Sequence, residues 1–223
     1  MDAPAFDAWS FWHFVTRLGE AQILLPAALG LCLWLAHRDE ARPVVIRWLA
    51  WMSIAAFVTT VTKVAFLGWG IGNATLNFTG ISGHSMFSAA VYPPLMYLTA
   101  SSRSSAWQRF AWLAGFALAL LVGVSRVKVG AHSWSEVATG VAIGSAVSVS
   151  TLWMARMTHP RVPLWLPLGV AAWLSLMPAH APASTTHDMV TRLALKLSGR
   201  QTPHTRSEMR RNWIKARAAE TSV

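Results

Sequence analysis

The chain has 223 residues, of which 54% are hydrophobic and 13% are charged, whereas soluble domains contain roughly 25% charged residues. This composition excludes an ordinary soluble domain and indicates a membrane protein, in which each spanning helix uses roughly 20 apolar residues. The formal net charge of +10 does not by itself indicate nucleic acid, because lysine and arginine also mark cytoplasmic loops and contact anionic lipid headgroups. The single cysteine, Cys32, excludes an intramolecular disulfide framework and a thiolate metal cluster.

The N-terminal segment, residues 1–17, is acidic and aromatic at its start and lacks the basic region of a cleavable signal peptide. We interpret it as a retained interfacial segment. The region 18–182 contains six apolar runs without the alternating pattern of a β-barrel, and irregular backbone cannot face lipid. The sequence therefore predicts an all-α integral membrane bundle of about six transmembrane helices, at 18–36, 44–67, 84–101, 107–124, 135–155 and 163–178.

Basic residues in the short connections predict the orientation. The connections after the first, third and fifth apolar runs carry Arg38, Arg42, Arg47, Arg103, Arg109, Arg156 and Arg161. The positive-inside rule assigns this side to the cytoplasm. The opposite side receives the segments 68–83 and 125–134, which hold or border the candidate catalytic residues. We therefore expect a bacterial inner (plasma) membrane protein with its active site on the non-cytoplasmic face.

The last segment, 183–223, is a basic tail with eight lysines or arginines. A sixth full span would place it on the non-cytoplasmic side, and we expect export because charge bias acts mainly near span ends. Its arginine-rich end is interpreted as a solvated helix or a helix that touches lipid headgroups, so we expect membrane lipids as partners and no nucleic acid. Whether 185–188, with His187, lies near the active site stays open.

A turn of small residues precedes the third apolar run. Ser82-Gly83-His84 would begin a helix whose unpaired N–H groups and dipole attract an anion such as phosphate. His84, in the first turn, titrates near neutral pH and could transfer a proton. The same residues also fit an ordinary serine cap with a buried, hydrogen-bonded histidine.

A second polar stretch, 125–136, precedes the fifth apolar run. His132 and Glu136 are four residues apart and share a helix face, so the carboxylate can hold one imidazole nitrogen and leave the other as a nucleophile. Arg126 offers a planar fork for phosphate oxygens, and Lys128 adds a point charge nearby. The structural alternative is an ion pair between Arg126 and Glu136 that seals the helix ends.

Together the two stretches resemble the type 2 phosphatidic acid phosphatase family, whose motifs read Lys-x6-Arg-Pro, Pro-Ser-Gly-His and Ser-Arg-x5-His-x3-Asp. The third motif is nearly complete. Ser125 and Arg126 are followed after five residues by His132, and Glu136 stands in the place of the aspartate.

The other two motifs are less complete. The second is present as residues 82–84, with Ile81 in the place of the proline. The first retains Lys63, but Gly70 and Ile71 stand where the family has arginine and proline. The resemblance covers 63–136 by motif, and the helix pattern extends it to about 18–178.

The resemblance implies that His132 attacks phosphorus to give a phosphohistidine, that Glu136 orients it, and that His84 protonates the leaving oxygen. It implies no cofactor and no metal. The expected substrate-binding residues are Lys63, Ser82, Gly83, Ser125, Arg126 and Lys128. Lys128 is included because it lies two residues from Arg126 and could replace the arginine that the first motif lacks.

The expected substrate is a lipid phosphate or pyrophosphate, because an apolar chain could stay between the helices while its headgroup reaches a polar pocket. The family implies phosphatidate, phosphatidylglycerophosphate or polyprenyl pyrophosphates. Two alternatives stay open, a lipid phosphotransferase and a lipid-phosphate binding or transport protein without hydrolysis. A zinc site formed by His84, His132 and Glu136 is a third, although the nearby cations Lys63 and Arg126 would repel a metal ion.

Overall fold

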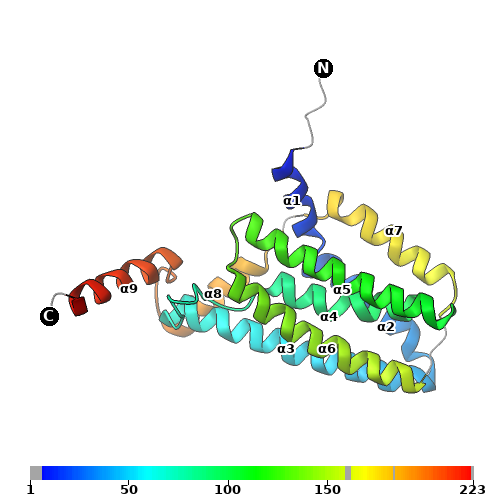
Figure 1. The fold of residues 1–223 in the computed structure, drawn as a ribbon. Helices are drawn as coiled ribbons and strands as arrows, with labels where there is room; N and C mark the ends of the chain where they lie inside the picture. The colour runs from blue at the N-terminus through cyan, green and yellow to red at the C-terminus, as the bar shows by residue number, and fades with distance from the viewer. Residues whose placement is uncertain (1–6, 159–161, 183, 222–223) are drawn as a thin grey trace.

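The computed structural model describes residues 7–158, 162–182 and 184–221. Within these ranges the regular elements are helices, and one isolated bridge joins Asn73 to Phe78. The predicted all-α membrane bundle is therefore confirmed (Figure 1). The elements are α1 (Ala8–Arg17), α2 (Ala21–Ala36), the short 3-10 helix η1 (Asp39–Ala41), α3 (Arg42–Trp69), α4 (Gly83–Thr99), α5 (Ser105–Lys128), α6 (Trp134–Thr158), α7 (Trp165–His180), α8 (Thr186–Ser198) and α9 (Arg206–Thr221).

Each predicted apolar run falls on one helix from α2 to α7. In the described part of the chain, three stretches are long and apolar enough to cross a membrane: Asp39–Trp69, Ser105–Lys128 and Trp134–Arg156. The pair α1 and α2, bent by 41°, forms a fourth candidate span. Helices α4 and α7 have 17 and 16 residues, fewer than the roughly 20 that a span needs. The predicted count of about six spans is therefore approximate.

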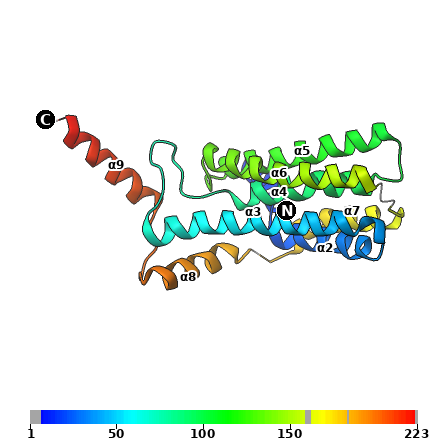
Figure 2. The ribbon, with the colours of Figure 1, turned by 90° about the horizontal axis from the view of Figure 1, so that it is seen from below.

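Helix α4 runs through the middle of the bundle and packs against both α5 and α6 (Figure 2). Two glycines on α6 allow the closest of these contacts. A Cβ atom at Gly140 would lie 2.6 Å from the Ser82 carbonyl oxygen, and one at Gly144 would lie 2.2 Å from the Met86 carbonyl oxygen. Small residues at such crossings let two helix backbones approach closely in a membrane bundle. This contact joins the start of α4 to the start of α6.

A Pro-Pro pair at 93–94 interrupts the hydrogen bonding of α4 without exposing its backbone. Prolines lack the N–H groups that would bond to the carbonyls of Ala89 and Ala90. The indole Nε1 of Trp48 on α3 donates to Ala90 O at 2.9 Å. The Ser148 hydroxyl of α6 donates to Ala89 O. Side chains of the neighbouring helices thus satisfy both carbonyls, as a lipid environment requires.

The two ends of the bundle differ in character. The connections between α2 and α3 and between α4 and α5, with the adjoining helix ends, carry five of the seven arginines that we assigned to the cytoplasm, and they lie together at one end (Figure 1). Arg161, which we assigned to the same side, lies outside the described residues. At the opposite end α3 and α5 finish and α4 and α6 begin. Helix α8 packs along the end of α3, and α9 projects away from the bundle (Figure 2).

Candidate active site

The loop that precedes α4 crosses directly over Lys63 on α3. Gly80 has a φ of +138°, and a Cβ atom there would lie 3.0 Å from Lys63 Cγ, so a side chain does not fit. The Ile81 N–H donates to Thr62 Oγ1 at 3.1 Å and fastens the loop to α3. Lys63 Nζ then lies 3.7 Å from the position of a Cβ atom at Gly83. The ammonium group is therefore beside the N-terminus of α4, so its charge adds to the positive end of the helix dipole.

Two serines that we expected to bind phosphate, Ser82 and Ser125, are hydrogen-bonded within the bundle. Ser82 is fully buried, caps α4 by accepting from the Ser85 N–H at 3.4 Å, and donates its own N–H to Glu136 O at 3.1 Å. Ser125 is also fully buried, and its hydroxyl donates to Val122 O at 2.6 Å inside α5. Neither lines the cavity described below. Ser82 thus joins α4 to α6.

A tight turn at the end of α5 brings His132 back over Arg126. Gly130 takes the left-handed conformation with a φ of +71°. The N–H groups of Ala131 and His132 then donate to Arg126 O at 3.0 and 3.1 Å. Lys128 is exposed and does not line the cavity. Residues two apart on a helix do not face each other, so the structure does not bring Lys128 to the cavity together with Arg126.

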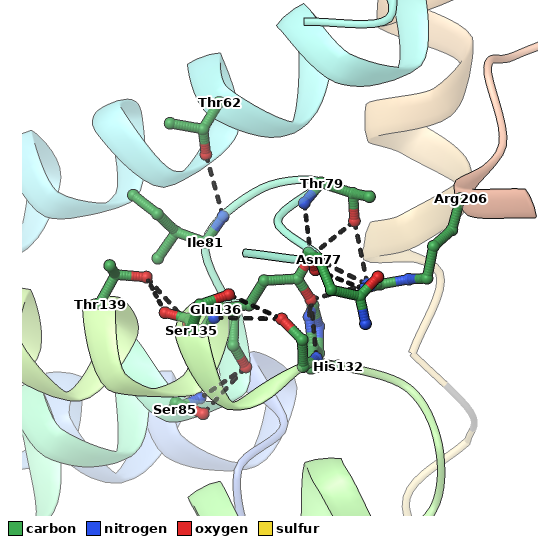
Figure 3. Close-up of polar contacts among 12 residues, drawn as sticks. Thr62, Asn77, Thr79, Ile81, Ser85, His132, Ser135, Glu136, Thr139 and Arg206 are labelled. Carbon is green, nitrogen blue, oxygen red and sulfur yellow. Dashed lines mark hydrogen bonds and ion pairs between the residues drawn. The ribbon is translucent and has the colours of Figure 1, made fainter. Parts of the chain in front are cut away.

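Glu136, at the start of α6, is fully buried and accepts hydrogen bonds at both carboxylate oxygens (Figure 3). Its Oε2 lies 2.7 Å from His132 Nδ1 and accepts the Ser133 N–H at 3.1 Å. Its Oε1 accepts the N–H and the hydroxyl of Thr79, each at 2.6 Å. The predicted pairing of His132 with Glu136 is therefore present, and the alternative, an ion pair between Arg126 and Glu136, is not among the ion pairs of the described residues.

The basic tail supplies a further partner that the sequence analysis missed. Arg206, the first residue of α9, donates from Nη2 to Glu136 Oε1 at 2.9 Å and to Oε2 at 2.8 Å. Its Nη1 donates to Asn77 O at 2.7 Å (Figure 3). We interpreted Arg206 as part of a solvated helix because its neighbours in sequence are basic and polar. The available signal was Glu136, a carboxylate bordering an apolar run, which needs a permanent countercharge when it is buried.

A cavity of about 560 Å³ opens between these elements. Of the residues predicted from sequence, it is lined by Lys63, Gly83, His84, Arg126 and His132. The connection between α1 and α2 and the tail contribute further residues that we did not predict: Gly19, Glu20, Ala21, Ser184, Thr186, His187, His204 and Arg206. His187, whose position the sequence left open, is thus at the site.

The cavity is cationic at its centre. His84 lies within electrostatic range of Arg126, Lys63 and His132. Arg126 donates from Nη1 to Thr16 Oγ1 at 2.7 Å, and its buried Nε has no hydrogen-bond partner among the described residues. A buried donor without a partner is costly unless a ligand accepts from it. This arrangement suits an anion such as a phosphoryl group.

The protonation state of His132 follows from its surroundings. Burial lowers the pKa of this imidazole below its ordinary value, and the cations Lys63 and Arg126 lower it further, while Glu136 acts in the opposite direction. The imidazole is therefore neutral at neutral pH. Because Nδ1 is bonded to Glu136, the lone pair of a neutral ring is at Nε2, where it can act as a nucleophile.

Comparisons with known proteins agree with this geometry. A family model described as the PAP2 superfamily matches residues 72–160, which include the loop over Lys63 and the second and third motifs. An uncharacterized 22.5 kDa protein in the cps region of Klebsiella pneumoniae is 31% identical over 202 residues, covering 89% of this chain and 97% of that protein. No solved structure matches the chain. The resemblance noted in the sequence is confirmed, and the chain belongs to the PAP2 superfamily, a type 2 phosphatidic acid phosphatase-like family whose membership implies phosphatase activity on phosphate esters.

Proposed function

We propose that the protein is a membrane phosphatase that hydrolyses a lipid phosphate or pyrophosphate through a phosphohistidine formed on His132. The observation that supports this most directly is the hydrogen bond of 2.7 Å between His132 Nδ1 and Glu136. It fixes the ring and leaves Nε2 for attack, in a cavity that also holds Lys63 and Arg126. A nucleophile oriented by a carboxylate beside groups that bind an anion is the arrangement that covalent catalysis needs.

In the first step, His132 Nε2 attacks phosphorus. The P–N bond forms as the bond from phosphorus to the leaving oxygen breaks, and His84 gives a proton to that oxygen. Burial and the neighbouring cations lower the pKa of His84, and the negative charge of a bound phosphoryl group opposes this, so His84 takes up its proton when the substrate binds. Lys63, Arg126 and the N–H groups at the start of α4 stabilise the negative charge on the phosphoryl oxygens. Glu136 stabilises the positive charge that develops on the His132 ring as the P–N bond forms.

In the second step, a water molecule attacks the phosphohistidine. The P–N bond breaks as the new P–O bond forms, and His84, now neutral, accepts the proton that the water loses. Inorganic phosphate leaves, and His132 returns to its neutral form. His84 thus acts first as an acid and then as a base, and every proton is accounted for.

A lipid substrate is supported by the apolar part of the cavity. Phe66, Leu67 and Phe87 line it together with the cations. A headgroup could lie at Lys63 and Arg126 while the hydrocarbon chain stays against these side chains. Phosphatidate, phosphatidylglycerophosphate and polyprenyl pyrophosphates all have this form. The arginine-bearing connections at the other end of the bundle support an active site on the non-cytoplasmic face of a bacterial inner membrane.

Phosphate release from these three lipids by the purified protein in detergent tests the proposal, with His132→Ala as the comparison. We expect release from at least one lipid by the wild-type protein and none above background by His132→Ala. Equal release by both proteins contradicts the mechanism. A short-chain ester with the same headgroup shows whether the apolar chain contributes, since a lipid enzyme should have a higher kcat/KM for the long-chain form.

The same assay separates the alternatives. Radiolabel that moves to a second lipid instead of appearing as inorganic phosphate indicates a phosphotransferase. Binding of the labelled lipid without release indicates a binding or transport protein. Because Lys63 and Arg126 supply the positive charge, we expect activity to persist with a metal chelator, and loss of activity that zinc restores would favour the zinc site instead.

A further inference from the structure

The segment that leads into α9 lies along the loop that follows α3. The His204 N–H donates to Leu67 O at 2.9 Å, at the end of α3. The His204 ring lies over Gly70, where a Cβ atom would be 3.3 Å from it. Met209 Sδ would be 3.0 Å from a Cβ atom at Gly72. The tail is therefore fastened at the place where the first motif has glycine instead of arginine.

This attachment brings one cation into the site. The Arg206 guanidinium reaches Glu136, 70 positions earlier in the chain, and contacts both carboxylate oxygens. It also donates to Thr79 Oγ1 at 3.0 Å and to Asn77 O at 2.7 Å. The Arg206 side chain is 30% exposed, whereas that of Glu136 is 0% exposed. One side chain from the tail therefore connects the loop before α4 to the buried carboxylate.

Glu136 has two reasons to need this partner. Its side chain has one more methylene, and so one more freely rotating bond, than the aspartate usual at this position, and an unfixed rotation would move the carboxylate away from His132. Its charge is also buried, and His132 is a countercharge only when it is protonated. A guanidinium is permanently charged and presents a rigid fork to a carboxylate. Arg206 meets both needs.

We propose that Arg206 is a positioning residue of the active site, supplied by the C-terminal segment, which holds the Glu136 carboxylate against His132. The inference rests on the proposed function, because it assigns a role within the same reaction. Arg206 acts through Glu136, whose hydrogen bond to His132 must keep its geometry as the ring becomes positively charged during phosphoryl transfer. Its contribution is therefore made mainly in the transition state, and kcat is the quantity that depends on it.

Kinetics of Arg206→Ala, Arg206→Lys and Arg210→Ala test the inference. Arg210 is the matched control, because it lies one turn further along α9, is exposed, and lines a different groove. We expect Arg206→Ala to lower kcat about 10- to 100-fold, the usual cost of losing a group that orients a catalytic side chain, with KM little changed. Arg206→Lys should recover part of this loss, and Arg210→Ala should match the wild type. A rise in KM with unchanged kcat would assign Arg206 to substrate binding and overturn the inference.

Two further measurements separate positioning from a merely structural role. Loss of the guanidinium removes a positive charge beside the His132–Glu136 pair, so the pKa of His132 should rise and the acid limb of kcat/KM should move to higher pH. Guanidinium ion added to the assay should restore part of the kcat of Arg206→Ala. If Arg206→Ala lowers kcat, but the acid limb of kcat/KM does not move and guanidinium ion restores no activity, the inference is contradicted.

A double-mutant cycle keeps the test valid if Arg206→Ala folds poorly. In a Glu136→Gln protein the buried charge is gone, and removing Arg206 should change kcat little further, because both residues act on the same step. Additive losses overturn the inference. If the wild-type activity depends on His132 but Arg206→Ala has wild-type kinetics, this inference alone is overturned. A wild-type protein without phosphatase activity overturns both it and the proposed function.

Discussion

At the scale of single residues, Glu136 is longer by one methylene than the aspartate of the family pattern, and its surroundings use the added length. The carboxylate contacts His132 in the turn just before α6, Thr79 on the loop before α4, and Arg206 on the tail. An aspartate would place its carboxylate about one carbon–carbon bond closer to the α6 backbone. It could not keep all these contacts without movement of the loop or the tail.

Glu136→Asp should therefore lower activity even though it restores the usual residue of the motif. We expect kcat to fall about tenfold or more, because the shorter carboxylate loses either His132 or Arg206, a loss of the size seen for groups that orient catalytic side chains. Phosphate release measured beside Glu220→Asp, at an exposed carboxylate on α9, controls for the substitution itself. Activity equal to or above wild type would show that the site does not depend on the longer side chain.

The pH dependence of the reaction should reflect the lowered pKa of His132. Protonation removes the lone pair that attacks phosphorus, so kcat/KM should be retained as pH falls through the ordinary imidazole value of about 6.5 and should decline only below it. Burial is the main cause of this shift. Glu136→Gln removes the carboxylate that opposes it and should move the acid limb lower still. An acid limb at or above pH 6.5 in the wild type contradicts the expected shift.

At the scale of the helices, the two prolines of α4 are tolerated because adjacent helices satisfy the carbonyls that they leave unpaired. Trp48→Phe removes the donor to Ala90 O, keeps most of the apolar volume, and leaves that carbonyl unsatisfied in the bundle core. We expect a loss of about 1–3 kcal/mol in the free energy of unfolding. Thermal unfolding in detergent measures it, and Trp51→Phe, at an exposed position on the same helix, is the control. Equal unfolding temperatures for the two variants would argue against this role.

The helices themselves were predictable from sequence, whereas part of the site was not. Apolar runs in a membrane have to be helical because lipid cannot satisfy the backbone. His132 and Glu136 are close in sequence, so their pairing is local, although His132 lies in the turn before α6 and not on a shared helix face. Arg206 is different, since nothing in the local pattern of a basic helix indicates contact with a residue 70 positions earlier. Lys128 shows the converse, since it is close to Arg126 in sequence but is exposed and does not line the cavity that Arg126 lines.

At the scale of the whole molecule, the active site and the basic tail lie at one end of the bundle, and the arginine-bearing connections lie at the other. The charge of the tail made it difficult to predict from sequence which side of the membrane the tail occupies, because eight lysines or arginines usually favour the cytoplasm. The contacts of Arg206 and His204 place the tail at the same end as the site, whichever way the protein is inserted.

Cysteine labelling in intact cells tests the orientation that we propose. Cys32 is buried in the bundle, so labelling should depend on introduced cysteines. Gln201 is exposed at the end of the bundle that holds the active site, and Ser105 is exposed at the start of α5 at the other end. Each is replaced by cysteine in a separate variant. A membrane-impermeant maleimide should label Gln201→Cys in intact cells and Ser105→Cys only after lysis. The reverse pattern would place the active site in the cytoplasm, and labelling of both in intact cells would contradict a bundle that crosses the membrane.

The pairing of Arg206 with Glu136 also bears on how the protein is made. Residues leave the ribosome in chain order, so Lys63, His84, Arg126, His132 and Glu136 all enter the membrane before Arg206 is synthesised. Until then the Glu136 carboxylate lacks its permanent countercharge, and burying it is unfavourable. We expect the loop before α4 to reach its final packing only when the tail arrives. A nascent chain that ends before Arg206 would then be inserted in the membrane but inactive. The protein would become active only after translation had passed α8.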